Sequence, residues 1–582
     1  MSVILLVIVD HISAQTTLAY NKDFELIKKG SSVWQINELD AAKIIYTDAI
    51  KSNGKYSLLI DGRQSAIVAD YFDASYFEAD FPENFLTKHK LIRIEAKVKT
   101  DSYKDRGGIW FVQIHGNDKP QMQMILADTI KDQSGWQQLR LETKLDPGAT
   151  FSGFGGTLNG PGKVWFDEFR VFVDGKEIKD IAALIPEPSG AEIASLNKAV
   201  VPLQLSDSGK EMKGFEKLSG RFGNTRITGA GEPTHGTREA SLYKIALFKW
   251  LVQNKGYNTF MLEDELPEAA VMNDCLMNGG DSATALLKKY FFPVWRTEEM
   301  AGLLQWIANY NKLHVKKLQF CGMDMQSARI AYPTLKRLSV ADEQLHDLVI
   351  RFSKAYDSIR ITKDPLLKKI YQEQTRTFLV DLMLFKKNNE FMLYKLMPPD
   401  SVHQLMFAID IMQQNFNANN GTFRDSCMAK NIIEYSRFNP EAKIFIWAHN
   451  SHVSKQKNWM GAILADHFGN EYYTIAAATA KGKYTASRDF AKTFWSAWPL
   501  EDTYPGTYEY YFEKAAAPDF ILPLHAVADN PGLKWLADEK DFRSIGFMQM
   551  KEQFNKSRLT HNFDAVIFFR NSSNTRSYMI KN

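Results

Sequence analysis

The chain has 582 residues, more than one hydrophobic core usually holds, so at least two domains are expected. Its composition is that of a globular protein, with 45% hydrophobic and 24% charged residues. A net charge of +3 gives no basis for binding nucleic acid or an anionic membrane surface. No apolar run is long enough to be a transmembrane segment.

The start of the chain predicts a secretory signal peptide at residues 1–15. Residues 3–9 are all apolar, and the small residues Ser13 and Ala14 follow, as at a cleavage site. No Lys or Arg precedes the apolar run, so a buried first strand is the alternative. We therefore expect an exported protein, periplasmic or extracellular. Three scattered cysteines argue against a disulfide framework and against a Cys-based zinc site.

Residues 20–180 have the pattern of an all-β sandwich. Residues 91–99 alternate apolar and polar or charged side chains, and residues 139–145 do the same. Strands with one buried face and one solvated face show this alternation. Turn-forming residues such as Asn53 and Gly54 recur between these segments. Short strands separated by such turns favour two packed antiparallel sheets.

This first region resembles the jelly-roll carbohydrate-binding modules of secreted enzymes. The resemblance rests on residues 21–25, 54–58, 134–136 and 162–168. It implies a glycan partner, because exposed aromatic side chains can stack on sugar rings, and Trp110 is the candidate. Trp136 and Trp165 are instead expected in the core.

A Pro- and Gly-rich stretch at residues 185–190 indicates a linker, which we place at residues 181–200. Residues 201–582 then alternate strand-like and helix-like segments, which predicts an α/β domain with a mainly parallel sheet. Residues 335–435 are mostly helical in pattern and form an insertion. The expected strands are residues 226–229, 259–262, 317–321, 443–447, 473–476 and 565–569.

Residues 231–240 are the most informative segment of the chain. They follow the first expected strand of the α/β domain and precede an amphipathic helix, and they place Glu232 and His235 three residues apart. In open α/β sheets such a turn lies at the carboxyl end of a strand, where ligands bind. A carboxylate and an imidazole are well suited to move protons near neutral pH. The segment therefore predicts an acid–base site.

Polar side chains also follow the next three expected strands. Glu263 follows the second strand, Asp324 the third, and His449 and His452 the fourth. One polar cluster would say little, because loops are generally polar. Parallel strands bring their carboxyl ends to one edge of a sheet, so all four clusters are expected to meet there.

Residues 231–236 and 447–453 are similar to the two signature motifs of the erythromycin esterase family. The similar stretches together cover about residues 205–582, nearly the whole second domain. Further stretches that match in the same order are residues 271–274, 295–299, 306–311, 322–326, 423–431, 460–461 and 563–567.

The resemblance implies a hydrolase that opens macrolide lactones, and so confers antibiotic resistance, without a Ser nucleophile. It places the general base on His235, acidic residues on Glu232 and Glu263, and the His of the second motif on His449. We expect His235 to activate water while Glu232 fixes its tautomer, a role that Glu263 shares. His449 would stabilise the oxyanion or protonate the leaving alkoxide.

Four further residues are assigned to substrate binding: His452, Lys244, Asp324 and Arg424. Lys244 stands where the family often has Arg, and Lys cannot offer a bidentate contact. His452 has a supporting role as its alternative. Asp324 has a helix cap as its alternative, and Arg424 an ion pair or cap with Asp425.

Two other functions remain open. Glu232, His235, Glu263 and His449 are suitable ligands for zinc or another divalent ion, which would give a metal-dependent hydrolase of a non-macrolide ester. Without a metal, no cofactor is expected. The other alternative is a glycan-binding surface protein whose α/β domain has lost its activity. The expected partners are thus a small-molecule ester or lactone, and a glycan on the N-terminal domain.

Overall fold

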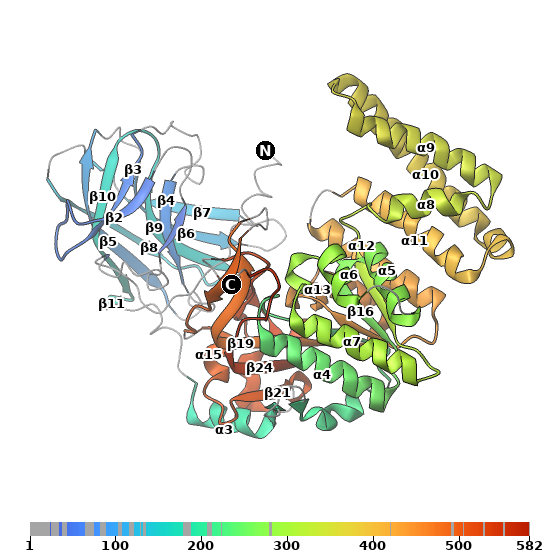
Figure 1. Cartoon of the computed structure of the whole chain (residues 1–582). Helices are drawn as coiled ribbons and strands as arrows, with labels where there is room; N and C mark the ends of the chain where they lie inside the picture. Colours follow the sequence, from blue (N-terminus) through green and yellow to red (C-terminus); the bar gives the residue numbers. More distant parts are fainter. Residues whose placement is uncertain are drawn as a thin grey trace.

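The structure is a computed structural model, and Figure 1 shows its two regions. It describes residues 24, 34–37, 43–63, 75–81, 89–102, 107–115, 121–127, 130–131, 135–178, 188–205, 212–222, 224–278, 282–418, 421–489, 494–504, 506–527, 530–550 and 553–580. The predicted signal peptide at residues 1–15 lies outside the described residues.

The N-terminal region is a sandwich of two antiparallel sheets, as predicted. One sheet has the order β1 (Gln35–Asn37), β4 (Ser75–Asp80), β9 (Phe151–Leu158), β6 (Gly107–His115) and β7 (Gln121–Leu126). The other has the order β2 (Lys43–Thr47), β3 (Ser57–Asp61), β10 (Lys163–Val173), β5 (Leu91–Asp101) and β8 (Gln137–Lys144), with β11 (Lys176–Ile178) beside β10. Along β5 every second side chain is buried, which confirms the alternation seen in the sequence.

The aromatic side chains of the sandwich correct one expectation. Trp110 is only 1% exposed, so the prediction that it stands free to stack on a sugar was wrong. It lies on β6 in a small buried cluster with Val112 and Ile114, on the face opposite the main core residues Ile109 and Phe111. Trp165 is buried as expected, whereas Trp136 is partly exposed.

The second region contains a nine-stranded sheet that is parallel in its centre. Five pairings join β24, β19, β15, β18, β16 and β17 in parallel. β21 pairs antiparallel with β24, β12 pairs antiparallel with β21, and β20 pairs antiparallel with β19, so the sheet is mixed rather than wholly parallel. In spatial order the bounds are β12 (Val201–Pro202), β21 (Asp519–Pro523), β24 (Ala565–Ser572), β19 (Tyr472–Ser487), β15 (Ile227–Ala230), β18 (Ile444–Trp447), β16 (Thr259–Glu265) and β17 (Gln319–Asp324), with β20 (Trp495–Pro499) beside β19.

Helices cover both faces of this sheet, and the two cores use alternate residues of the same strands. Phe260 and Leu262 of β16 pack into one core, while Met261 between them packs into the other. Helices of the first core are α4 (Arg238–Lys255), α5 (Leu266–Asn278), α6 (Ala283–Tyr290) and α7 (Glu298–Leu313). Helices of the second are α3 (Gly190–Ala199), α12 (Gly421–Phe438), α14 (Met460–Phe468) and α15 (Tyr508–Phe512).

The segment predicted as a linker, residues 181–200, contains a helix. Residues 190–199 form α3, and its N-cap Ser189 makes a reciprocal capping box with Glu192. Leu196 of this helix is buried in a core of the α/β domain. The domain therefore begins before the predicted boundary at residue 201.

The predicted helical insertion is present between β17 and β18. It projects from the sheet as α8 (Ala331–Ser339), α9 (Glu343–Ile361), α10 (Pro365–Leu396) and α11 (Pro399–Phe416), and α12 returns the chain to the sheet. These helices enclose a core of their own. No helix in the described part of the chain is sufficiently long and apolar to span a membrane.

The remaining elements are short. They are β13 (Gln204–Leu205), β14 (Met212–Lys213), β22 (Lys540–Arg543), β23 (Phe554–Ser557), α13 (Asn450–Val453), α16 (Leu559–Asn562) and the 3-10 helices η3 (Phe215–Phe222), η4 (Pro293–Trp295), η5 (Gly469–Glu471), η6 (Leu524–Val527) and η7 (Pro531–Leu536).

Candidate active site

The carboxyl ends of four adjacent parallel strands meet as the sequence predicts. Glu232 follows β15, Glu263 lies near the end of β16, Asp324 ends β17, and His449 follows β18. The four strands lie side by side in the order β15, β18, β16, β17. Their residues are almost entirely buried, so the sheet fixes the backbone from which these polar side chains project.

Glu232 and His235 form a hydrogen-bonded pair. His235 Nδ1 lies 2.7 Å from Glu232 Oε1, and Glu232 is fully buried. Burial alone would raise the pKa of Glu232, but Lys244 and His235 lower it below its ordinary value. An ionised carboxylate only accepts hydrogen bonds, so Nδ1 of His235 carries the proton and donates it to Glu232. In neutral His235, Nε2 is then the unprotonated nitrogen.

Two donors contact the second carboxylate oxygen of Glu232. Trp447 Nε1 donates to Glu232 Oε2 at 2.9 Å, and Lys244 Nζ of α4 forms an ion pair with the same oxygen. Lys244 is fully buried, and this burial lowers its pKa to about 8 despite the opposing charge of Glu232. Lys244 does not line the cavity, so the structure places it behind Glu232 rather than in contact with a substrate.

His449 is a neutral histidine with a defined tautomer. Burial, followed by the charges of His235 and His452, lowers the pKa of His449 to about 3. The backbone N–H of Ser451 donates to His449 Nδ1 at 3.3 Å, and Ser451 Oγ lies 2.7 Å from the same nitrogen. Because a backbone N–H can only donate, Nδ1 is the acceptor and Nε2 carries the proton.

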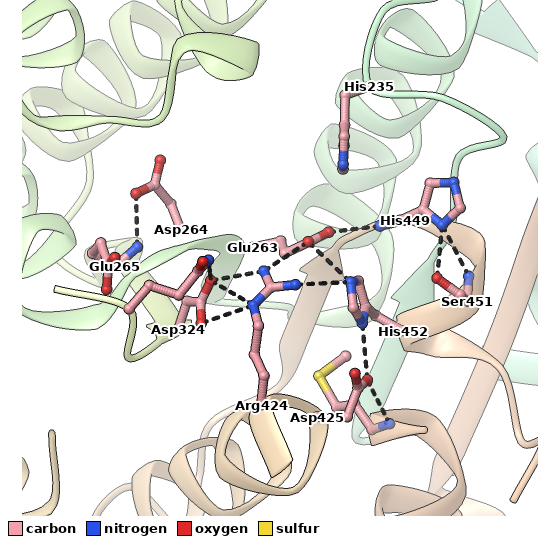
Figure 2. Close-up of polar contacts among 12 residues, drawn as sticks. His235, Glu263, Asp264, Glu265, Asp324, Arg424, Asp425, His449, Ser451 and His452 are labelled. Carbon is pink, nitrogen blue, oxygen red and sulfur yellow. Dashed lines mark hydrogen bonds and ion pairs between the residues drawn. The ribbon is translucent and has the colours of Figure 1, made fainter. Parts of the chain in front are cut away.

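His452 has the opposite character, because it lies between two carboxylates. Its Nε2 is 3.1 Å from Glu263 Oε1 and its Nδ1 is 2.8 Å from Asp425 Oδ1 (Figure 2). Burial would lower the pKa of His452, but these two carboxylates raise it to about 9. His452 is therefore an imidazolium at neutral pH, which makes it a hydrogen-bond donor and not a base.

Arg424 joins this ion-pair network from α12. Its Nη2 donates to Glu263 Oε1 at 2.9 Å and to Asp324 Oδ2 at 2.7 Å, and its Nε also donates to Asp324. Asp324 is fully buried and does not line the cavity, so the structure gives it the role of holding Arg424. Asp324 Oδ1 also accepts from the backbone N–H of Met325, but the next helix, α8, begins only at Ala331, so Asp324 is not the helix cap considered from the sequence.

Five of the predicted side chains line one cavity of about 320 Å³. In Figure 2 the ring of His235 points toward the space between Glu263 and His449. The His235 and His449 ring centres are 5.6 Å apart. Predicted residues on the cavity wall are His235, Glu263, Arg424, His449 and His452. The others on the wall are Phe292, Pro293, Val294, Trp295, Gln326, Ser451, Trp459, Gly546 and Phe547.

The metal alternative was based on the residue types at this site. Within the described residues, no group of three or more His, Cys, Asp or Glu side chains is arranged to hold a metal ion. Glu232 uses both of its oxygens on His235, Lys244 and Trp447. His449 uses Nδ1 as an acceptor for Ser451.

Three functional contacts were missed by the sequence analysis, although their residues lie within the matched stretches. Trp447 supports Glu232, Asp425 holds His452, and Trp295 lines the cavity with its ring 5.1 Å from that of His235. Trp295 Nε1 also donates to the backbone carbonyl of Glu263 at 2.9 Å. Of these three residues, only Trp447 could have been suspected from the sequence, because it lies two residues before His449.

Comparisons with known proteins found a family model and several similar chains. A family model described as erythromycin esterase matches residues 252–572. Erythromycin esterase type II of Escherichia coli is 22% identical over 49% of this chain and 76% of its own length. A Bacillus cereus protein of known crystal structure is 21% identical, with a TM-score of 0.58 over 68% of this chain and 100% of its own. The xylan-binding domain of Paenibacillus barcinonensis Xyn10C is 17% identical over 26% of this chain and 92% of its own, with a TM-score of 0.21.

Proposed function

The chain belongs to the erythromycin esterase family, and we propose that it hydrolyses an ester or lactone with water activated by His235. The Glu232–His235 pair carries this proposal. Glu232 fixes the Nδ1–H tautomer of His235, which leaves Nε2 as the proton acceptor on the cavity wall. The imidazolium formed when His235 takes a proton from water is stabilised by the adjoining carboxylate.

The groups opposite His235 are suited to the negative charge that develops on the ester oxygen. Attack by water converts the carbonyl oxygen into an oxyanion, which is stabilised by fixed donors in a site of low dielectric constant. His452 and Arg424 are cations on the cavity wall, each paired with carboxylates. The Nε2–H of His449, 3.4 Å from the Pro233 carbonyl, is a neutral donor beside them. We assign the oxyanion to these donors.

The leaving alkoxide needs a proton when the tetrahedral intermediate collapses. We propose that His235 returns the proton that it took from water, because a general base becomes a general acid in the second half of such a reaction. The pKa of His452, raised to about 9, makes it a poorer acid at neutral pH, so its role is electrostatic.

Macrolide lactones enter the proposal through the name of the E. coli relative. The ester is otherwise left open, and export of the chain and glycan binding by its sandwich are further proposals from the sequence. We propose a reaction in which side-chain donors of the chain itself, His449 and His452, contact the oxyanion in place of a metal.

The test is the turnover of a panel of chromogenic esters, with erythromycin as a further substrate, by the wild type and by His235→Asn. We expect wild-type turnover that survives removal of metals with a chelator, and a variant that is folded but inactive. Asn retains a polar side chain but cannot accept and release a proton near neutral pH. A folded and active His235→Asn protein would contradict the proposal.

A further inference from the structure

A second cavity adjoins the candidate active site on the side of the helical insertion. It has a volume of about 470 Å³, and its wall is built from the segment after β17, from α8 and α9, and from Asn415 at the end of α11. Gln326 lines both cavities, so this side chain separates the one from the other. A long substrate held at His235 would have to pass Gln326 to reach the second cavity.

The charged side chains on the wall of the second cavity are two arginines, Arg329 and Arg360. Arg329 already has an ion-pair partner, because its Nε donates to Glu268 Oε1 at 3.3 Å. Arg360 lies in the last turn of α9 and is exposed. Its side chain makes no hydrogen bond or ion pair with any part of the chain that the structure describes. A guanidinium so placed is available to a ligand.

The rest of this wall suits an organic ligand. The rings of Tyr332 and Tyr356 meet edge to face with centres 5.1 Å apart. The Tyr332 hydroxyl donates to Asp357 Oδ2 at 2.8 Å, which fixes the Asp357 side chain without removing its negative charge. The aromatic surface can pack against an apolar ligand body, while the guanidinium of Arg360 can pair with a carboxylate.

We propose that the second cavity binds the remote part of an ester substrate that carries a carboxylate, and that Arg360 determines this specificity. The inference rests on the proposed function of the adjoining cavity, since the scissile ester must lie near His235. An ester with a cationic group in the same position would face Arg360 and is disfavoured. Neutral esters lose the ion pair but keep the aromatic contact.

Binding can be tested without turnover by replacing the ester with an amide. The probes are the mono-N-methylamides of succinate, adipate and sebacate, each compared by calorimetry with a neutral amide of equal chain length. We expect at least one of these anions to bind on the order of tenfold more tightly than its neutral partner in the wild type at low salt. Arg360→Gln should reduce that preference to about twofold or less.

Lys354→Gln is the matched control, because it removes one positive charge from the same helix at a residue that does not line the cavity. This variant should keep the preference for the anion. Equal binding of anionic and neutral amides by the wild type, or a preference that persists in Arg360→Gln, would overturn the inference. If the wild type prefers the anionic amides through Arg360 but hydrolyses no ester, only the proposed function is contradicted.

Discussion

Glu265 offers a quantitative test of the electrostatics behind the site. It is 2% exposed, and three other carboxylates, those of Asp264, Glu268 and Asp324, surround it. Burial, followed by the charges of Asp324, Glu268 and Asp264, raises the pKa of Glu265 from 4.5 to about 9. Glu265 is therefore protonated in the folded protein at neutral pH and ionised in the unfolded chain.

The sign of the effect on stability follows from this difference. A group whose pKa is raised on folding contributes stability that is fully present below its pKa in the unfolded chain. This contribution is lost as pH rises toward its pKa in the folded protein. For Glu265 the loss runs from pH 4.5 to about pH 9. One pH unit in that window costs about 1.4 kcal/mol, so Glu265 destabilises the fold by about 3 kcal/mol at pH 7 relative to pH 4.5.

Glu265→Gln should remove this loss, because an amide has the shape of the protonated acid and does not ionise. Urea unfolding at pH 5 and at pH 7 measures the effect. We expect the two proteins to have similar free energies of unfolding at pH 5 and the variant to be more stable by a few kcal/mol at pH 7. Glu441→Gln, at an exposed carboxylate, is the control and should show no gain. A gain that does not grow with pH would refute the reasoning.

Further predictions concern the ion pairs and hydrogen bonds around His235 and His452. The rate constant kcat/KM should fall as pH rises through about 9, because the raised pKa of His452 sets the loss of its positive charge. Asp425→Asn removes one of the two carboxylates that hold His452, so this fall should move to lower pH; an unchanged pH profile would contradict the assignment. Lys244→Met leaves the carboxylate of Glu232 buried without its cation and should destabilise the protein by about 3–5 kcal/mol in urea unfolding. Trp447→Phe removes the indole donor to Glu232 and should lower kcat on the order of tenfold while KM changes little, whereas a change in KM alone would indicate a packing role.

The sheet and the meeting of the four strand ends could be predicted because both follow from local patterns. Short apolar segments at regular intervals gave the central strands, and parallel pairing then required Glu232, Glu263, Asp324 and His449 to lie at one edge. The antiparallel strands β20 and β21 were missed. Nothing in a short strand's own sequence states the direction of its partner.

The partners of each site residue were harder to predict, because they depend on contacts between distant segments. Lys244 lies twelve residues after Glu232, and only the packing of α4 against the sheet turns it toward that carboxylate rather than the cavity. Asp425 reaches His452 from a different helix. Trp110 was misjudged for the same reason, since its burial depends on neighbouring strands of the sandwich.

The central claim is that the Glu232–His235 pair activates water for ester hydrolysis. The most direct measurement is the rate of ester hydrolysis by the wild type, Glu232→Gln and His235→Asn, with each protein's fold confirmed by circular dichroism. We predict activity in the wild type, no detectable activity in folded His235→Asn, and a loss on the order of a hundredfold or more in Glu232→Gln. Wild-type rates in folded His235→Asn would contradict the account.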